Sequence, residues 1–236
     1  MDWEYLVEEL RKSYYTQLLM TSTSILVLII YLKRRTKNTI YLFLLSLASL
    51  LQGIFASYYN FTVENPLLRK TIVNILIYAY LVCEITFCLS YIRNFIHQRV
   101  YKRLLLIINL LLILSILCCL ILNPTERSLI STIEIIEGFV IIIPSLYFLY
   151  ESFKSPSSIN IFRSPAFWAI SGMLILFSTV TPLFLTLEYI RRNYFFLLRH
   201  LYAINNVAYS LMFIMFIKSI FIEKDKEALI TSDYIK

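Results

Sequence analysis

The sequence predicts an all-α membrane protein, a polytopic helical bundle that crosses a bilayer seven times. Of its 236 residues, 59% are hydrophobic and only 16% are charged, and the mean hydropathy is +0.72. A soluble domain has roughly 45–50% apolar and about 25% charged residues, so this composition cannot cover a surface that faces water. The polar connections between the apolar runs are short and leave no room for a soluble domain.

Seven runs are long enough to span a membrane. A transmembrane helix needs about 20 mostly apolar residues, and charges, prolines and asparagines mark off the runs. They cover approximately residues 14–32, 39–59, 71–92, 104–122, 129–150, 165–187 and 196–221. We therefore expect one transmembrane domain over residues 1–222 and a short cytoplasmic tail over residues 223–236.

The basic residues predict the orientation, because Lys and Arg in short loops are retained on the cytoplasmic side. They are densest between the first two runs and between the third and fourth, at Lys33, Arg34, Arg35, Lys37, Arg93, Arg99, Lys102 and Arg103. This bias places the N-terminus outside and the C-terminus in the cytoplasm, in a multi-pass protein of the cell (inner or plasma) membrane. It also accounts for the net charge of +7 without a nucleic-acid partner.

Polar side chains at helical spacing mark the faces that turn away from lipid. Six of the runs carry such a stripe, made of Gln17, Thr21 and Ser24; Ser46, Ser49, Gln52 and Gly53; Tyr80, Glu84, Cys88 and Tyr91; Ser131, Glu134, Glu137, Gly138 and Ser145; Ser171, Ser178 and Thr179; and Tyr202, Asn205, Asn206 and Tyr209. The fourth run is apolar all round and is expected at the periphery. The four cysteines lie inside apolar runs, so we expect free thiols.

Three carboxylates, Glu84, Glu134 and Glu137, lie inside the predicted spans, where no Lys or Arg lies deep enough to neutralise them. An ionised carboxylate in hydrocarbon is costly, so each is expected to be protonated, hydrogen-bonded or exposed to a water-filled cavity. Intramembrane ionisable residues are for this reason candidates for function. Glu84 is nearest the middle of its run, which favours a functional or gating role.

Glu134 and Glu137 are three residues apart, about 60° around a helix, and so share one face. Two like charges at that spacing oppose each other's ionisation, which favours a shared proton or a bound cation. Arg199 and His200 enter the last run from the same side and could pair with them. The alternative is that Glu134 lies near the lipid headgroups while Glu137 bonds a neighbouring helix.

The candidate ligand-binding or proton-coupling residues are therefore Glu84, Glu134, Glu137, His200, Asn205, Asn206, Tyr80 and Tyr202. No catalytic residue is predicted, because no nucleophile and base stand out. The chain has only two histidines and three glycines. These numbers are too small for a multi-histidine zinc site or a glycine-rich phosphate loop, so neither an enzyme nor a metal or cofactor is expected.

The sixth run has a recognisable motif, Ser164-Pro165-Ala166-Phe167-Trp168 followed by Ser171-Gly172-Met173-Leu174-Ile175-Leu176-Phe177-Ser178. It resembles the N-P-x-F-W and G-x-L-x-Y-F-S-G run of small seven-helix membrane proteins from Bacteroidetes-type bacteria, which are related to the membrane sensor modules of histidine kinases. Glu84 and Asn205 or Asn206 also resemble positions of that group. The chain departs from its pattern at Leu176 and Thr179. The resemblance implies a seven-helix architecture and a sensory role.

Three functions follow as hypotheses. The first is a receptor-like, sensory protein in which a stimulus in the outer half of the bundle shifts the last three helices, and which signals to a separate partner such as a histidine kinase. The second is a small proton- or cation-coupled transporter that uses the intramembrane glutamates. The third is a non-catalytic accessory subunit of a membrane complex.

Overall fold

The computed structural model describes residues 3–36, 38–123, 127–154, 161–194 and 197–233, which form helices almost throughout and contain no strand. The elements are α1 (Trp3–Lys33), α2 (Ile40–Thr62), α3 (Pro66–Phe95), α4 (Arg99–Leu122), α5 (Arg127–Lys154), a short 3-10 turn η1 (Ile161–Arg163), α6 (Pro165–Asn193) and α7 (Leu198–Asp233). All seven α-helices are long and apolar enough to cross a membrane. The predicted fold class and number of spans are confirmed.

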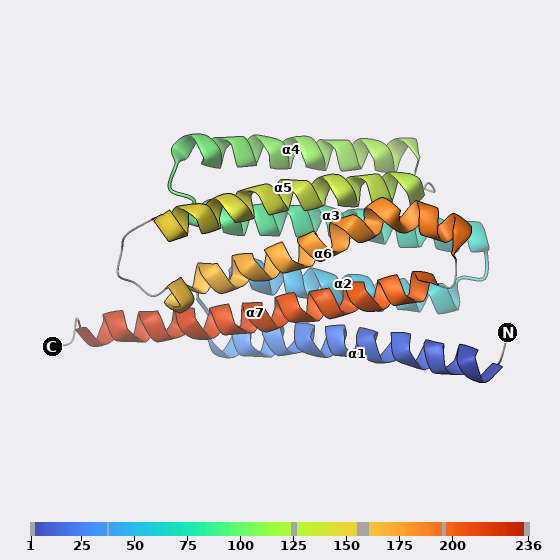
Figure 1. The fold of residues 1–236 in the computed structure, drawn as a ribbon, viewed down its shortest axis with the longest axis horizontal. Helices are drawn as coiled ribbons and strands as arrows, with labels where there is room; N and C mark the ends of the chain where they lie inside the picture. The colour runs from blue at the N-terminus through green and yellow to red at the C-terminus, as the bar shows by residue number, and fades with distance from the viewer. Residues whose placement is uncertain (1–2, 37, 124–126, 155–160, 195–196, 234–236) are drawn as a thin grey trace.

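The helices lie side by side along the long axis of the molecule, with their connections at alternate ends (Figure 1). Because the connections are short, each helix runs antiparallel to the one before it. The end at which α1 begins is called here the N-terminal face, and the opposite end the C-terminal face. The α1, α3, α5 and α7 helices run from the first face to the second. The predicted orientation of these faces in a cell remains a prediction.

Local sequence signals begin and bend these helices. The Asn65 side chain accepts hydrogen bonds from the amides of Leu67 and Leu68 at the start of α3, where Pro66 occupies the first turn. Proline also stands inside two helices, at Pro144 in α5 and Pro182 in α6. Each removes one amide from the helical ladder, which membrane helices tolerate when neighbouring groups compensate.

Six helices form a closed ring. Neighbours along it are α1 and α2, α2 and α3, α3 and α5, α5 and α6, α6 and α7, and α7 and α1. In this six-helix ring α3 and α7 lie on opposite sides. The α4 helix packs outside it against α3 and α5 (Figure 1), and only its Leu105 and Ile116 are buried. The predicted peripheral position of the fourth helix is confirmed.

Aromatic side chains of α3 and α7 fill much of the ring. The largest side chains that are fully buried include Tyr78, Tyr91, Phe213 and Phe216. The hydroxyls of Tyr91 and Ser219 lie 3.4 Å apart and link α3 to α7 in the half nearer the C-terminal face. Helix association in lipid depends on close packing and interhelical hydrogen bonds, and both are present between these two helices.

Two glycines allow α5, α6 and α7 to approach closely. A Cβ at Gly138 of α5 would overlap the hydroxyl of Thr181 in α6. A Cβ at Gly172 of α6 would lie 3.0 Å from the Cβ of Met215 and 3.3 Å from the carbonyl oxygen of Met212, both in α7. Small residues at such contacts let helix backbones meet in the absence of a hydrophobic driving force.

The predicted polar stripes are correct in the first half of the chain only in part. Ser24, Ser46 and Ser49 are buried, and the Ser24 hydroxyl donates to the Ser46 carbonyl oxygen at 2.9 Å, which joins α1 to α2. Gln17, however, is exposed, as is Ser178 in α6. Gln17 lies near the start of its span, where a polar side chain reaches the headgroups without turning inward. Ser178 lies in the middle of α6, so polarity alone does not mark the inner face there either.

The four cysteines have free thiols, as predicted, with Cys88 buried and Cys118 exposed. Two helices are longer than the predicted spans that they contain. The α1 helix begins eleven residues before the predicted first span, at Trp3, and α7 continues through the expected tail to Asp233. Neither extension is interrupted by a helix-breaking residue, so the helices run on past the apolar segments.

Candidate functional site

Glu84 is the centre of a hydrogen-bonded cluster inside the ring. It lies on α3 and is only 2% exposed. Its Oε1 accepts a hydrogen bond from the Tyr80 hydroxyl, one turn earlier on the same helix, and another from the Tyr209 hydroxyl of α7, each at 2.9 Å. The second bond crosses the ring. Glu84 is therefore both a buried carboxyl group with two donors and a bridge between opposite helices.

Glu137 lies on α5 and contrasts with Glu84. It is 1% exposed, and its Oε1 is enclosed without a hydrogen-bond partner among the described residues. Burying a carboxyl oxygen without a donor is costly, and more so when the group is ionised. Glu137 is thus held in the interior by its helix without the hydrogen bonds that stabilise Glu84.

The carboxyl groups of Glu84, Glu134 and Glu137 are close enough for their charges to interact. The hydroxyls of Tyr80 and Tyr209 donate to Glu84. They are also close enough to Glu137 for its charge to act on them. No Lys, Arg or His of the described part is among the groups that act on the three carboxyls. Glu134 is half-buried, so the predicted pair on α5 faces the cluster with Glu137 deeper than Glu134.

Thr181 of α6 supplies a second unpartnered polar atom at the same level. Its side chain is 3% exposed, and its hydroxyl has no hydrogen-bond partner in the described structure. The hydroxyl lies against Gly138, the residue that follows Glu137. The adjoining helices α5 and α6 therefore each contribute one buried oxygen atom without a partner among the described residues.

The other predicted site residues are not among the donors to Glu84. His200 is exposed, and Tyr202 is 51% exposed. Asn206 donates to the Thr16 hydroxyl of α1 at 3.3 Å and so joins α7 to α1. Asn205 lies one turn before Tyr209 on α7, and its Oδ1 is buried without a partner among the described residues. The expected pairing of Arg199 with the glutamates concerns a side chain outside the described ones.

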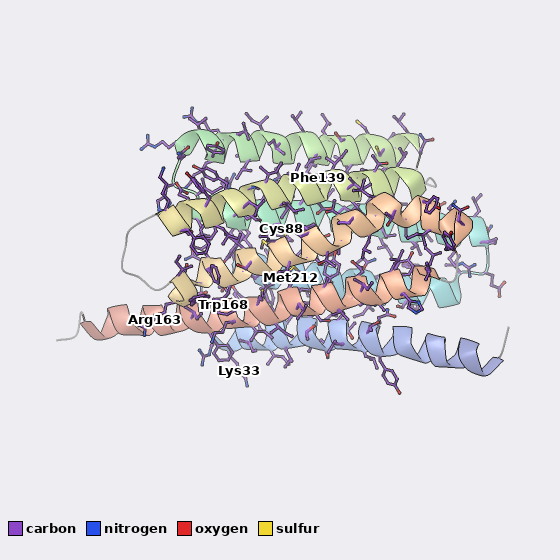
Figure 2. All side chains as sticks on the ribbon, in the orientation of Figure 1. Lys33, Cys88, Phe139, Arg163, Trp168 and Met212 are labelled. Atoms are coloured by element: carbon purple, nitrogen blue, oxygen red, sulfur yellow. The ribbon has the colours of Figure 1, made fainter. Side chains whose placement is uncertain are left out.

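The residues labelled in Figure 2 show where the neighbours of Glu84 lie between the two faces. Cys88, one turn after Glu84 on α3, and Met212 of α7 lie in the middle of the bundle. Lys33, Arg163 and Trp168 lie toward the C-terminal face, at the left of the view. The carboxyl cluster is therefore far from the basic residues of that face, which agrees with the absence of a described cation among the groups that act on it.

Sequence reasoning did not assign two residues of this cluster to the site. Tyr209 belongs to the predicted stripe of the last helix, and its position three to four residues from Asn205 and Asn206 was the available signal. Thr181 was missed because the predicted stripe of α6 runs through Ser178 and Thr179. The Thr179 hydroxyl instead donates to the Ile175 carbonyl of its own helix at 2.8 Å, so it needs no partner inside the bundle.

The arrangement is suited to proton chemistry more than to metal binding. Among the described residues, no three His, Cys, Asp or Glu side chains are placed to hold one metal ion. Carboxyl and phenol groups in hydrogen-bonding contact can accept, donate and exchange protons. A change in the charge of Glu84 would also change the strength of its bond to α7, because bonds to an ionised acceptor are the stronger ones.

Comparison of the chain with protein-family models, with curated proteins and with solved structures finds no match.

Proposed function

We propose that this chain is a receptor-like, sensory membrane protein in which α7 carries a change at the carboxyl cluster to the C-terminal face. The observation that carries the proposal is the hydrogen bond from Tyr209 to Glu84. The α7 helix continues from Tyr209 without interruption to Asp233 and extends beyond the other helices at that face (Figure 1). A continuous helix transmits displacement and rotation along its axis, so the site and the extension can move together.

A movement of α7 would change its contacts with neighbouring residues near the C-terminal face. The Asn38 side chain, between α1 and α2, donates to Glu223 of α7 at 2.7 Å. The Arg34 guanidinium lies 4.0 Å from the centre of the Phe221 ring, also in α7. The bond from Asn38 to Glu223 is exposed, and a single polar or cation–π contact of this kind is weak compared with core packing. These contacts can therefore break and re-form at a small cost in free energy when α7 moves between two positions.

The signal would pass to a separate protein on the side to which α7 extends. The density of Lys and Arg predicts that this side is the cytoplasm of a cell with the protein in its inner or plasma membrane. A histidine kinase is the partner that the sequence resemblance suggests. The lipid bilayer itself is the partner for the exposed apolar faces, such as Ile121 and Leu122 of α4, which are 78% and 74% exposed.

The test is a distance measurement between spin labels in nanodiscs, in a chain with its four cysteines replaced by alanine. One label pair joins Val100, at the start of α4, to Lys218 of α7, and a control pair joins Val100 to Leu32 of α1; all three side chains are exposed. The variant Tyr209→Phe removes the bridge and is compared with the unchanged chain.

We expect Tyr209→Phe to shift the mean distance from Val100 to Lys218 by about 2 Å, the size of helix shifts in switching proteins. The distance from Val100 to Leu32 should stay unchanged. Identical distances in both pairs would show that α7 does not respond to the bridge, and the sensory proposal would then fail.

A small proton- or cation-coupled transporter is the second candidate, and the ring favours it. The ring consists of two three-helix units, α1 to α3 and α5 to α7, whose helices run in the same order of directions and are separated by the outlying α4. Parallel repeats of this kind occur in transporters that bind substrate between their halves. Liposomes that contain the purified protein and dissipate a proton or solute gradient, with loss of flux on Glu84→Gln, would establish transport in place of signalling.

A further inference from the structure

We propose that Glu137 and Glu84 share one exchangeable proton in the ring interior, and that this proton is the chemical species to which the protein responds. The proton site stands on the geometry of the cluster. Its role as the stimulus rests on the proposed sensory function.

The two carboxyl groups differ in their hydrogen-bond partners. Glu84 receives two phenol hydrogen bonds, which stabilise a negative charge on its Oε1. Glu137 is as deeply buried, and its Oε1 receives none among the described residues. When only one proton is available to the pair, Glu137 is therefore the group that holds it, and Glu84 remains the acceptor for Tyr80 and Tyr209.

The described titratable groups around Glu84 and Glu137 are all acids. The α3 helix contributes Tyr80, Glu84 and Cys88, α7 contributes Tyr209, and α5 itself contributes Glu134. All of these become negative when they lose a proton. Because no described cation offsets them, ionising both Glu84 and Glu137 would bury two negative charges without compensation.

Thr181 of α6 supplies a polar group near Glu137. Its buried hydroxyl has no partner among the described residues and lies against the backbone next to Glu137. A protonated Glu137 has an O–H that needs an acceptor, whereas an ionised Glu137 needs a donor, and a threonine hydroxyl can serve as either. Thr181 is thus placed to accompany the proton in both states.

The tight packing around the two carboxyl groups favours a proton over a larger ion. Glu84 and Glu137 are 2% and 1% exposed, so an ion with a coordination shell could not reach them unless helices separated. A bound proton adds no heavy atom. It enters from water, converts one carboxylate to a carboxylic acid, and leaves by the reverse step, with no other bond made or broken.

The proton would act on α7 through Glu84. While Glu137 holds the proton, Glu84 is ionised and accepts a charge-assisted bond from Tyr209. If the proton moves to Glu84, its carboxyl group becomes neutral and the bond across the ring weakens. Transfer of the proton to Glu84, or uptake of a second proton there, would in this way alter the link between α3 and α7.

Infrared spectroscopy of the purified chain in nanodiscs tests the site directly. A buried protonated carboxyl group gives a C=O stretch separate from the carboxylate bands, and this stretch shifts in D2O. We expect the band in the unchanged chain at neutral pH and its loss in Glu137→Gln. The control Glu151→Gln alters a carboxyl at the other end of the same helix, near His97, and should keep the band.

A band that is absent at neutral pH in the unchanged chain would overturn the proton site, whatever the variants do. A band of equal intensity in Glu137→Gln would overturn its assignment to this residue. Exchanging potassium for sodium at constant pH should leave the band unaltered, and its disappearance in sodium would show that a metal ion occupies the site instead.

Failure of the sensory role has a different signature. If Glu137→Gln removes the band while the distances from α7 to α4 stay constant across pH, the proton site holds and the sensory proposal fails. If the band, the distances and their pH response all follow Glu137, both stand.

Discussion

Glu84 and Glu137 are two carboxyl groups of equal burial in one interior, and they differ in their contacts. Glu84 has two phenol donors and connects opposite sides of the ring. Glu137 has an enclosed oxygen without a partner among the described residues. The comparison shows that burial of a charge-bearing side chain does not by itself define its role. One glutamate is fixed by hydrogen bonds as a structural bridge, whereas the Oε1 of the other is buried without a described donor.

The largest effect is expected from disturbing the helix that holds Glu137. The substitution Gly138→Val places side-chain atoms where the Thr181 hydroxyl lies and should lower the free energy of unfolding by about 3 kcal/mol, the upper end for overpacking. The control is Gly53→Val, because a Cβ added at Gly53 would have no neighbouring atom within 4 Å. It should change stability by less than about 0.5 kcal/mol. Thermal unfolding in detergent measures both, and equal losses would contradict the close α5–α6 contact.

The next effect comes from removing the acceptor of the bridge. Glu84→Met keeps the side-chain volume but leaves the hydroxyls of Tyr80 and Tyr209 without their common partner. We expect a loss of about 2 kcal/mol, because a buried donor without an acceptor costs its desolvation energy. Glu84→Gln retains an acceptor oxygen and serves as the control. A stability of Glu84→Met equal to that of Glu84→Gln would mean that the two hydrogen bonds contribute nothing.

The two tyrosines should differ from each other. Tyr209→Phe removes a bond between helices on opposite sides of the ring, so a loss of about 1 kcal/mol is expected. Tyr80→Phe removes the bond to Glu84 within α3 and should cost less than about half of that amount. Unfolding of the two variants under identical conditions checks the order, and a larger loss for Tyr80→Phe would show that the bridge is not the important contact.

The smallest effect is expected at the C-terminal face. Asn38→Ala removes the hydrogen bond to Glu223, which is exposed, so the stability should fall by less than about 0.5 kcal/mol. The same variant should nevertheless broaden the distance distribution between labels at Val100 and Lys218, because it loosens the end of α7. An unchanged distribution would remove this contact from the path of signal transmission.

The sequence predicts the fold well because the bilayer imposes two simple requirements. Backbone groups in hydrocarbon must be bonded within the helix, and each span needs enough apolar residues to cross. The seven predicted runs therefore match seven helices. The ends of α1 and α7 escape prediction, because a helix can continue into the polar region after the apolar run stops.

The candidate site is less predictable for a different reason. Glu84 and Glu137 are conspicuous because a carboxyl group cannot be satisfied by its own helix backbone. Serine and threonine can donate to the carbonyl one turn earlier, as Thr179 does to Ile175 and Thr186 does to Pro182. Their presence on a helix face therefore does not reveal which face is inward. Tyr202 is 51% exposed, as tyrosines near the end of a span are at the membrane surface.

The comparison between the two glutamates is tested most directly by giving both the same replacement. Glu84→Met and Glu137→Met conserve volume and remove one carboxyl group each, and their free energies of unfolding can be measured in the same detergent at neutral pH. We predict that Glu84→Met is destabilised by about 2 kcal/mol, while Glu137→Met is unchanged or stabilised by about 1 kcal/mol, because an unpartnered buried polar group is removed. Equal destabilisation of the two variants would contradict the contrast between them, since Glu137 would then have partners as strong as those of Glu84.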